Sequence, residues 1–228
     1  MPLFRLALFC FILLNSMNIM GQTHGSVTLI SKPFKPNIAE SIELLTQLEQ
    51  NTIYLYSDIS TQSFIYWTNF SRLYPQKFRD SILIPFINEQ PAVNGSYSNS
   101  LLDELASLDP LPFLMPEQLL TNAASKHAVN IIKNGGRISH QSANGTSFSD
   151  RIKLEGIKFC AAENIFNGAN NDALVALLLL YLDIGLPNLG HRKNLLNANY
   201  TQMGLGLGIL PNKYYLIVQD FGCTPSVK

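Results

Sequence analysis

Residues 203–221 have the sequence MGLGLGILPNKYYLIVQDF, and this stretch decides the fold class. In its first half glycine alternates with apolar residues, residues 211–213 (PNK) are typical of a turn, and residues 214–221 are typical of a partner strand. The stretch therefore predicts a β-hairpin. One face of its first strand would carry no side chains, so we expect another element to approach that face closely. The glycines concerned are Gly204, Gly206 and Gly208.

Upstream of this hairpin the chain is mostly helical in pattern. Residues 173–182 (ALVALLLLYL), capped by Asp172, predict a helix that is apolar all round and lies at the centre of the fold. A second helix is expected from about Pro116 to the Gly135-Gly136 stop. Helices followed by a hairpin favour an α+β domain over alternating βαβ units, and no helix follows the glycines as a dinucleotide-binding fingerprint requires.

The first half of the chain predicts further helices. Residues 61–88 have a helical, aromatic-rich pattern, which we expect Pro75 to interrupt and Pro85 to end. Asn94-Gly95 marks a turn inside a polar loop. Residues 39–50 suit a short amphipathic helix, with apolar residues at Ile42, Leu45 and Leu48. The expected organisation is a signal peptide at 1–21, an N-terminal extension at 22–59 and one domain at 60–228.

The signal peptide is expected because Arg5 precedes the apolar run 6–14 (LALFCFILL), and small residues follow near Gly21. The run is shorter than the ~20 apolar residues that a membrane span needs, although an uncleaved anchor helix is the alternative. We therefore expect a secreted protein, periplasmic or extracellular, with no stable membrane span after cleavage.

The composition indicates which classes of partner this protein can have. Of 228 residues, 46% are hydrophobic and 14% charged, which allows a sizeable core. The formal net charge is +0 and no block of like charges occurs, so we expect no nucleic-acid partner. Beyond the signal region the chain has Cys160 and Cys223, which form either one disulfide or two buried thiols.

Four side chains in the second half have the chemistry of a functional site: His140, Glu163, Asp183 and His191. Two imidazoles and two carboxylates are suited to holding a divalent metal or to moving protons near neutral pH. Their separations fit no local metal motif, so the residues alone do not bring them together. Each one, taken singly, is also compatible with an ordinary structural role.

Several short motifs nevertheless occur in one order along the chain. They are Asn69-Phe70-Ser71-Arg72 before Pro75, Ser139-His140 with Asn144-Gly145 and Asp150-Arg151, Ala162-Glu163-Asn164-Ile165 with Gly168, Gly190-His191-Arg192 with residues 194–197 (NLLN), and residues 218–221 (VQDF). The series resembles the CAP superfamily (cysteine-rich secretory proteins, antigen 5 and pathogenesis-related class 1 proteins) in its bacterial form. The resemblance covers roughly residues 60–223, and several motifs in one order are more specific than any single one.

The resemblance implies an α-β-α sandwich with a central antiparallel sheet and a shallow cleft that gathers two histidines and two acids. In some members this cleft binds zinc or another divalent ion. By this resemblance His140 and His191 are the metal ligands, and Glu163 and Asp183 complete the set of candidate catalytic residues. Asp183 stands where the family usually has glutamate and is one methylene shorter. His127 is expected to be a packing residue outside the cleft.

Two functions from different classes follow from the resemblance. The first is an extracellular binding module for a lipid, glycan or protein ligand. The alternative is a divalent-metal-dependent hydrolase, with His140 and His191 as ligands and Glu163 as general base to a bound water. A serine hydrolase is disfavoured because the chain has no G-x-S-x-G motif. A scaffold whose polar cluster is only a hydrogen-bonded network is the third interpretation.

Overall fold

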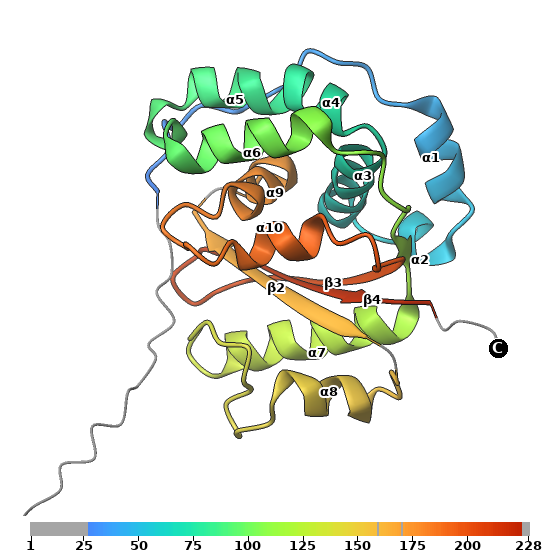
Figure 1. Cartoon of the computed structure of the whole chain (residues 1–228). Coiled ribbons are helices and arrows are strands. Elements are labelled where there is room, and N and C mark those ends of the chain that lie inside the picture. The colour runs from blue at the N-terminus through green and yellow to red at the C-terminus, as the bar shows by residue number, and fades with distance from the viewer. Residues whose placement is uncertain (1–26, 159, 170, 225–228) are drawn as a thin grey trace, which may run out of the picture.

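The computed structural model describes residues 27–158, 160–169 and 171–224. The expected signal peptide lies outside these residues. The chain forms three layers, an α-β-α sandwich (Figure 1). Helices α7 (Gln118–Lys133) and α8 (Phe148–Leu154) cover one face of a central sheet. The larger helical layer covers the other face and includes α3 (Ile59–Leu73), α9 (Ala173–Leu182) and α10 (Gly190–Leu195).

The sheet has four strands in the order β1-β3-β4-β2. The expected hairpin is confirmed: β3 (Gln202–Ile209) pairs antiparallel with β4 (Tyr215–Gly222). Strand β2 (Ala161–Gly168) pairs antiparallel with β4 and lies at the edge. The sheet is not antiparallel throughout, because the two-residue strand β1 (Met115–Pro116) pairs parallel with β3.

The bare glycine face of β3 is packed against helix α7, as expected. A Cβ atom on Gly204 would lie 2.1 Å from the backbone nitrogen of Thr121, and one on Gly206 would lie 2.4 Å from the carbonyl of Ala124. Both contacts are far shorter than real Cβ contacts, so the helix can approach this strand only because these positions are glycine.

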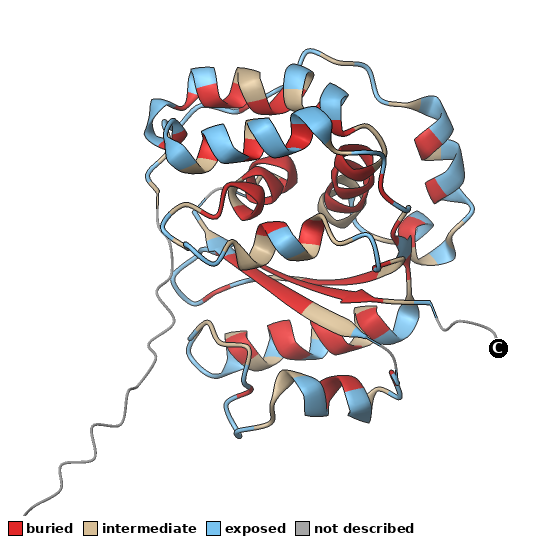
Figure 2. Ribbon diagram, in the orientation of Figure 1, coloured by how far each residue is buried: buried red, intermediate tan, exposed pale blue. Residues whose placement is uncertain are grey.

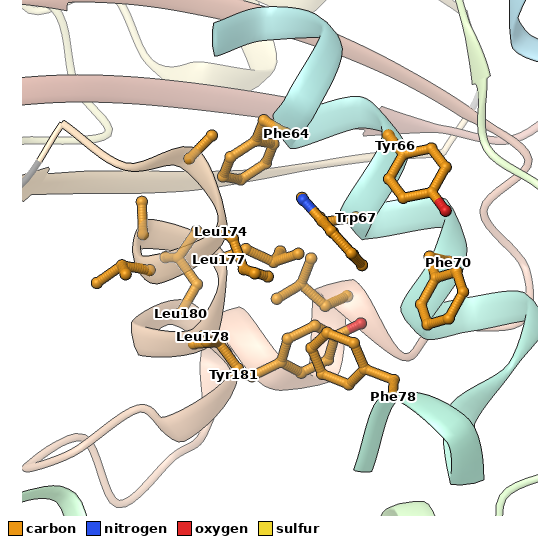
Figure 3. Packing of buried hydrophobic residues seen from close by; sticks show 14 of the residues in the cluster. Phe64, Tyr66, Trp67, Phe70, Phe78, Leu174, Leu177, Leu178, Leu180 and Tyr181 are labelled. Carbon is orange, nitrogen blue, oxygen red and sulfur yellow. The ribbon is translucent and has the colours of Figure 1, made fainter. Parts of the chain in front are cut away.

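The main core lies between the sheet and the larger helical layer. Helix α9 is buried on nearly all sides there, as its apolar sequence predicts (Figure 2). It packs against α3, where Phe64 and Trp67 face its leucines (Figure 3). The fully buried Tyr181 hydroxyl makes a 2.8 Å hydrogen bond with the hydroxyl of Ser71. Burial raises the pKa of Tyr181 to about 12, so this phenol stays neutral.

Two predictions about prolines and loops need correction. Pro75 begins a new helix, α4 (Pro75–Phe78), as expected, but Pro85 does not end one. A π-helical turn at Arg79–Leu83 is followed directly by α5 (Ile84–Glu89), and Pro85 occupies the first turn of α5. Pro85 lacks an N–H donor, and it lies directly after a π-helical turn, where the regular α-helical hydrogen bonding is already interrupted.

The segment after Asn94-Gly95, expected to be a loop, is helix α6 (Ser96–Ser107), which follows a short 3₁₀ turn (Pro91–Val93). Because the first turn of α6 is polar, its sequence does not show the apolar spacing that is typical of a helix. Leu101 and Leu105 are buried one helical turn apart and supply the apolar contact that stabilises it.

The N-terminal segment packs on the domain through two short helices, α1 (Ile42–Glu49) and α2 (Thr52–Leu55). The buried residues of α1 are Leu44 and Leu48, whereas Ile42, expected on the apolar stripe, is exposed. The side chain of Ser41 caps α1, and the Ser41 N–H donates to the hydroxyl of Tyr66 at 2.7 Å. The boundary between extension and domain at residue 59 stays a prediction.

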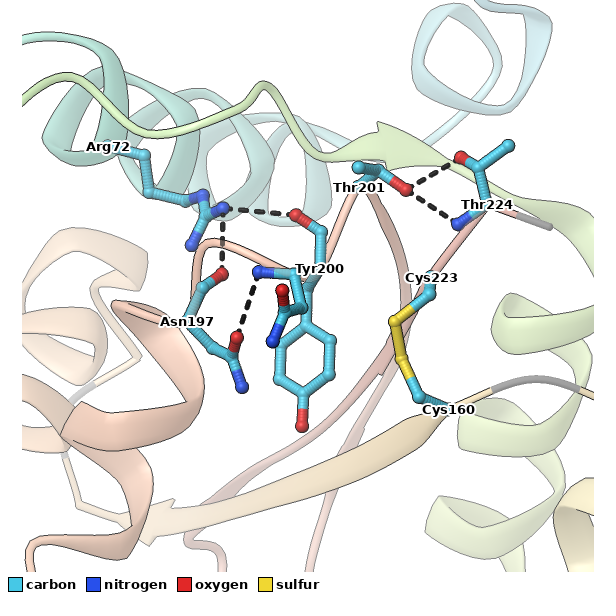
Figure 4. The surroundings of a disulfide bond; sticks show 8 residues. Arg72, Cys160, Asn197, Tyr200, Thr201, Cys223 and Thr224 are labelled. Carbon is cyan, nitrogen blue, oxygen red and sulfur yellow. Dashed lines mark hydrogen bonds between the residues drawn. A yellow bond between two sulfur atoms is a disulfide. The ribbon is translucent and has the colours of Figure 1, made fainter. Parts of the chain in front are cut away.

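A disulfide bond joins Cys160 to Cys223, with the two Cα atoms 5.5 Å apart (Figure 4). The bond ties the start of β2 to the end of β4, one residue outside their paired register. Of the two alternatives for these cysteines, the structure therefore has the disulfide. Within the described residues, no helix is both long enough and apolar enough to cross a membrane.

Candidate functional site

The four candidate residues form two imidazole–carboxylate pairs. His140 Nδ1 lies 2.8 Å from Glu163 Oε1, and His191 Nδ1 lies 2.6 Å from Asp183 Oδ1. His140 and Glu163 are more than twenty positions apart in the sequence, so the fold brings this pair together. Asp183 and His191 are close in the sequence. Whether the two pairs act as one site stays a prediction.

The first pair is held from three directions. Glu163 is in β2, and Arg151 of α8 donates to both of its oxygens, with Nη2 at 2.7 and 2.9 Å. Arg151 Nη2 also donates to the backbone carbonyl of His140 at 3.1 Å. Helix α7 contributes His127, which is buried as expected of a packing residue, and its Nε2 contacts the carbonyl of Ser139 at 2.8 Å. The loop that carries His140 is thus tied to both helices of this layer.

His127 itself is outside the exposed part of the site. Burial is the main cause that lowers its pKa, since an imidazolium is hard to desolvate. A neutral ring whose Nε2–H donates to the Ser139 carbonyl satisfies this environment. The residue therefore helps to position the loop of His140.

The second pair is built at the end of α9. Asp183 adopts a left-handed backbone conformation there, with φ of 49°, and its side chain accepts the backbone N–H of Arg192 at 3.0 Å. Leu189, with φ of 51°, makes the reversal into α10, where His191 lies. Arg192 is buried and donates to the carbonyls of Tyr181 and Tyr97, which ties α10 to α9 and α6. These contacts set the direction of His191.

An amide network connects the two pairs. Asn194 Nδ2 donates to Asn164 Oδ1 at 2.8 Å and to the Glu163 carbonyl at 3.4 Å. Asn164 Nδ2 in turn donates to the His191 carbonyl at 3.3 Å. Adjacent residues of a strand face opposite sides of the sheet, so Glu163 belongs to the α7–α8 side and Asn164 to the α9–α10 side. The amide network therefore joins the backbone of β2 at Glu163 to the backbone of α10 at His191.

The exposed groups of this site are the imidazoles. The side chains of His140 and His191 are 40% and 22% exposed, whereas those of Glu163 and Asp183 are 1% and 0% exposed. Each carboxylate is on the buried side of its imidazole and accepts a hydrogen bond from Nδ1. Within the described residues, the Nε2 atom of neither histidine makes a hydrogen bond. In each pair the imidazole is therefore the exposed group and the carboxylate is covered.

This donor set fits a divalent metal only in a limited way. A metal-ligating histidine usually gives its other ring N–H to a carboxylate, as both histidines do here. Among the described residues, however, no group of three or more His, Cys, Asp or Glu side chains is arranged to hold a metal ion. In such a site the two imidazoles would be the ligands, and Glu163 and Asp183 would orient them without binding the metal themselves.

Sequence reasoning missed Asp220, which is opposite Glu163 in the register of β4 and β2. It is fully buried, and burial followed by the charge of Glu163 raises its pKa well above the usual value. The sequence analysis also assigned no role to Arg151, although Asp150-Arg151 is one of the motifs. The alternation of strand β4 was the available signal for Asp220, since it places an acid on a face that must be covered.

An open groove of about 800 Å³ borders the second pair. We call it the α9 groove; its walls are residues 27–33, residues 165–169 of β2 and its following turn, and the end of α9 with Asp183, Ile184 and Leu186. His191 and Asp183 lie in its wall, whereas His140 and Glu163 do not. The N-terminal segment, to which the sequence assigned no chemistry, therefore forms one side of this groove.

Comparison with known proteins found similarities to several solved structures. The chain shows 29% identity to an extracellular protein of Bacillus anthracis containing an SCP domain, over 56% of this chain and 39% of that protein (TM-score 0.41). An outer surface protein of Borrelia burgdorferi is 22% identical, over 57% of this chain and 90% of that one (TM-score 0.43). The venom allergen-like protein 4 of Schistosoma mansoni is 15% identical, over 75% and 92% (TM-score 0.43). No curated protein matches the chain.

The chain thus spans about two fifths of the Bacillus protein. The family model that matches is that of the cysteine-rich secretory protein family, over residues 103–221. This match includes β2, β3, β4, α7 to α10 and all four candidate site residues. Because it covers more than half of the sequence, and because the three-layer fold is the one that the sequence motifs imply, this chain belongs to the cysteine-rich secretory protein family, CAP.

Proposed function

We propose that this protein is an extracellular binding module whose ligand lies in the α9 groove, next to the His191–Asp183 pair. The observation that carries the proposal is the groove itself, an open volume of about 800 Å³ whose wall combines aliphatic side chains with polar ones, the His191–Asp183 pair among them. Export is supported by the signal-peptide pattern in the sequence and by the Cys160–Cys223 disulfide, since disulfides persist in oxidising compartments outside the cytosol.

Of a lipid, a glycan and a protein, the lining of the groove favours a lipid-like ligand. Aliphatic side chains contributed by all three walls line it: Leu29, Ile165, Leu179, Ile184 and Leu186. An acyl chain would remove this apolar surface from water, which stabilises binding by about 25 cal/mol per Å² buried. The polar end of the ligand would then face His191.

A charge placed in the groove is expected to abolish lipid binding. Ile184 lines the groove and is partly exposed, so Ile184→Asp should lower the affinity for palmitate at least tenfold, because an acyl chain cannot solvate a carboxylate. His191→Ala should retain most of the affinity, since the aliphatic walls are unchanged. Calorimetric titration of palmitate into the mature protein measures both effects.

Leu154→Asp is the matched control, because Leu154 is exposed at the end of α8, on the other side of the sheet from the groove. It should bind palmitate like the parent. Equal binding by Ile184→Asp and Leu154→Asp would contradict the proposal. So would a parent that binds an oligosaccharide or a peptide but not palmitate.

The second candidate is the divalent-metal-dependent hydrolase, which the two carboxylate-backed imidazoles favour. His140 and His191 would hold the ion through Nε2, and the ion would supply a water of lowered pKa. The proposed role of Glu163 changes in this candidate. Its oxygens accept from His140 and Arg151 and it is almost fully buried, so it orients His140 and does not meet water directly.

Zinc titration at pH 7 tests this second candidate without any assay of activity. If both imidazoles are ligands, zinc binds the metal-stripped parent, and His140→Ala and His191→Ala each lower the affinity at least tenfold. Affinity should also fall as the pH is lowered, because a ligating imidazole must be neutral. A folded parent that binds no zinc would remove the hydrolase candidate and leave the lipid-binding proposal unaffected.

A further inference from the structure

One row of side chains crosses the sheet beneath α7. Gly204, Asp220 and Glu163 are neighbours in register on β3, β4 and β2. Register partners in antiparallel strands place their side chains on the same face. Asp220 is therefore enclosed between Glu163 on one side and the α7 backbone packed on Gly204 on the other, and it is fully buried.

Asp220 receives no hydrogen bond from a donor group of the described residues. Both of its carboxyl oxygens are buried without such a partner. The group next to it on the same face is the carboxylate of Glu163, which acts on the pKa of Asp220 both through its charge and as a side-chain hydrogen-bond partner. Two carboxylates in contact do not both ionise, so the pair holds one proton.

The surrounding charges decide which acid holds that proton. Arg151 of α8 and His140 of the preceding loop both contact Glu163, and neither makes a hydrogen bond with Asp220. Helix α7 contributes His127, which burial keeps neutral, and β3 contributes only glycine at this position. The negative charge is therefore stabilised on Glu163, and the proton belongs on Asp220.

We propose that Asp220 is a positioning residue, which stays protonated at neutral pH and donates its O–H to the carboxylate of Glu163. Glu163 then stays ionised and receives hydrogen bonds from Asp220, Arg151 and His140. An ionised Glu163 fixes the proton of His140 on Nδ1, which leaves the Nε2 lone pair directed to the exposed side of the site. This holds whichever ligand the protein binds.

A neutral buried acid leaves a signature in the pH dependence of folding. In the unfolded chain Asp220 loses its proton near the ordinary aspartate pKa of 3.8, whereas in the folded protein burial and Glu163 raise that pKa. Between these two pKa values the unfolded state releases the proton and the folded state keeps it. The folding equilibrium constant therefore falls as the pH rises, by up to tenfold for each pH unit.

Asp220→Asn removes this titration and keeps an N–H donor for Glu163. Urea unfolding of the parent and of Asp220→Asn from pH 4 to pH 8 compares their folding constants. The ratio of the variant's constant to the parent's should rise at least tenfold between pH 4 and pH 7. Asp109→Asn, a change at an exposed acid, is the control and should show a flat ratio. A flat or falling ratio for Asp220→Asn would overturn the proposal.

The effect on His140 separates positioning from packing. By NMR at pH 7, Asp220→Asn should leave the ring ¹⁵N signals of His140 in place, because the donor to Glu163 is retained and no charge is removed. Asp220→Leu should shift these signals, because Glu163 loses that donor. A shift in Asp220→Asn as large as the shift in Asp220→Leu would contradict a neutral Asp220 that donates to Glu163. Should neither variant fold, the carboxyl ¹³C shift of Asp220 in the parent at pH 7 decides between the protonated form and the ionised form.

Discussion

Gly206→Ala is expected to destabilise the fold by about 3 kcal/mol or more, the upper range for overpacking a core. The added Cβ would lie 2.4 Å from both the carbonyl carbon and the oxygen of Ala124, and 2.6 Å from the backbone nitrogen of Ser125. These are backbone atoms inside helix α7, which cannot rotate away as a side chain can. The helix must move off β3, and its buried contacts with the sheet are lost with it.

Gly208→Ala is the matched control for this prediction. It is on the same strand and the same face, but its Cβ would meet only the side chain of Ile132, with the terminal Cδ1 at 2.4 Å. That methyl group can change rotamer, so we expect a loss of less than about 1 kcal/mol. Urea unfolding followed by circular dichroism measures both variants. Equal losses at the two positions would show that the backbone contact is not what makes glycine necessary.

Arg72→Met should destabilise the protein by about 3–5 kcal/mol, because it leaves several buried carbonyls without donors. Arg72 is fully buried in α3, and its guanidinium donates to four backbone carbonyls, those of Pro112, Leu195, Asn197 and Tyr200. Pro112 precedes β1, Leu195 ends α10, and Asn197 and Tyr200 lie between α10 and β3 (Figure 4). Methionine fills much of the volume and donates to none of them.

Arg79→Met provides the comparison. Arg79 is partly exposed and donates to one backbone carbonyl, that of Leu102, so its loss should cost less than about 1 kcal/mol. Chemical denaturation gives both free energies of unfolding. Because Arg72 anchors the segment that follows α10, we also expect the NMR signals of His191 to shift in Arg72→Met and not in Arg79→Met. Similar free energies for the two variants would contradict the role given to the buried guanidinium.

Local patterns predicted the parts of the fold that depend on neighbours in sequence. The β3–β4 hairpin follows from a period of two with a turn between, and the central place of α9 follows from a helix that is apolar on every side. The glycines of β3 even indicated the close approach of a helix. In each case a short stretch of sequence is enough to predict the element.

Strand β2 and helix α6 were not predicted, because both are stabilised by residues that are distant in the sequence. Strand β2 includes Glu163 and Asn164, polar residues that are buried because Arg151 and Asn194 satisfy them from other elements. Helix α6 begins with a polar turn and is stabilised by contacts with α4 and α9. Neither kind of partner is visible within a short window of sequence.

The sequence by itself determined the kinds of side chain that meet in the site and the family to which their motifs belong. Only the tertiary structure decided how they pair, with each carboxylate buried behind one imidazole and only the imidazoles exposed. It also decided that Asp220 lies beside Glu163 and that residues 27–33 wall the α9 groove. The physical reason is that the interaction between charged groups and the burial of a side chain depend on which groups are close in space. Strand register and helix packing bring together residues that are far apart in the sequence.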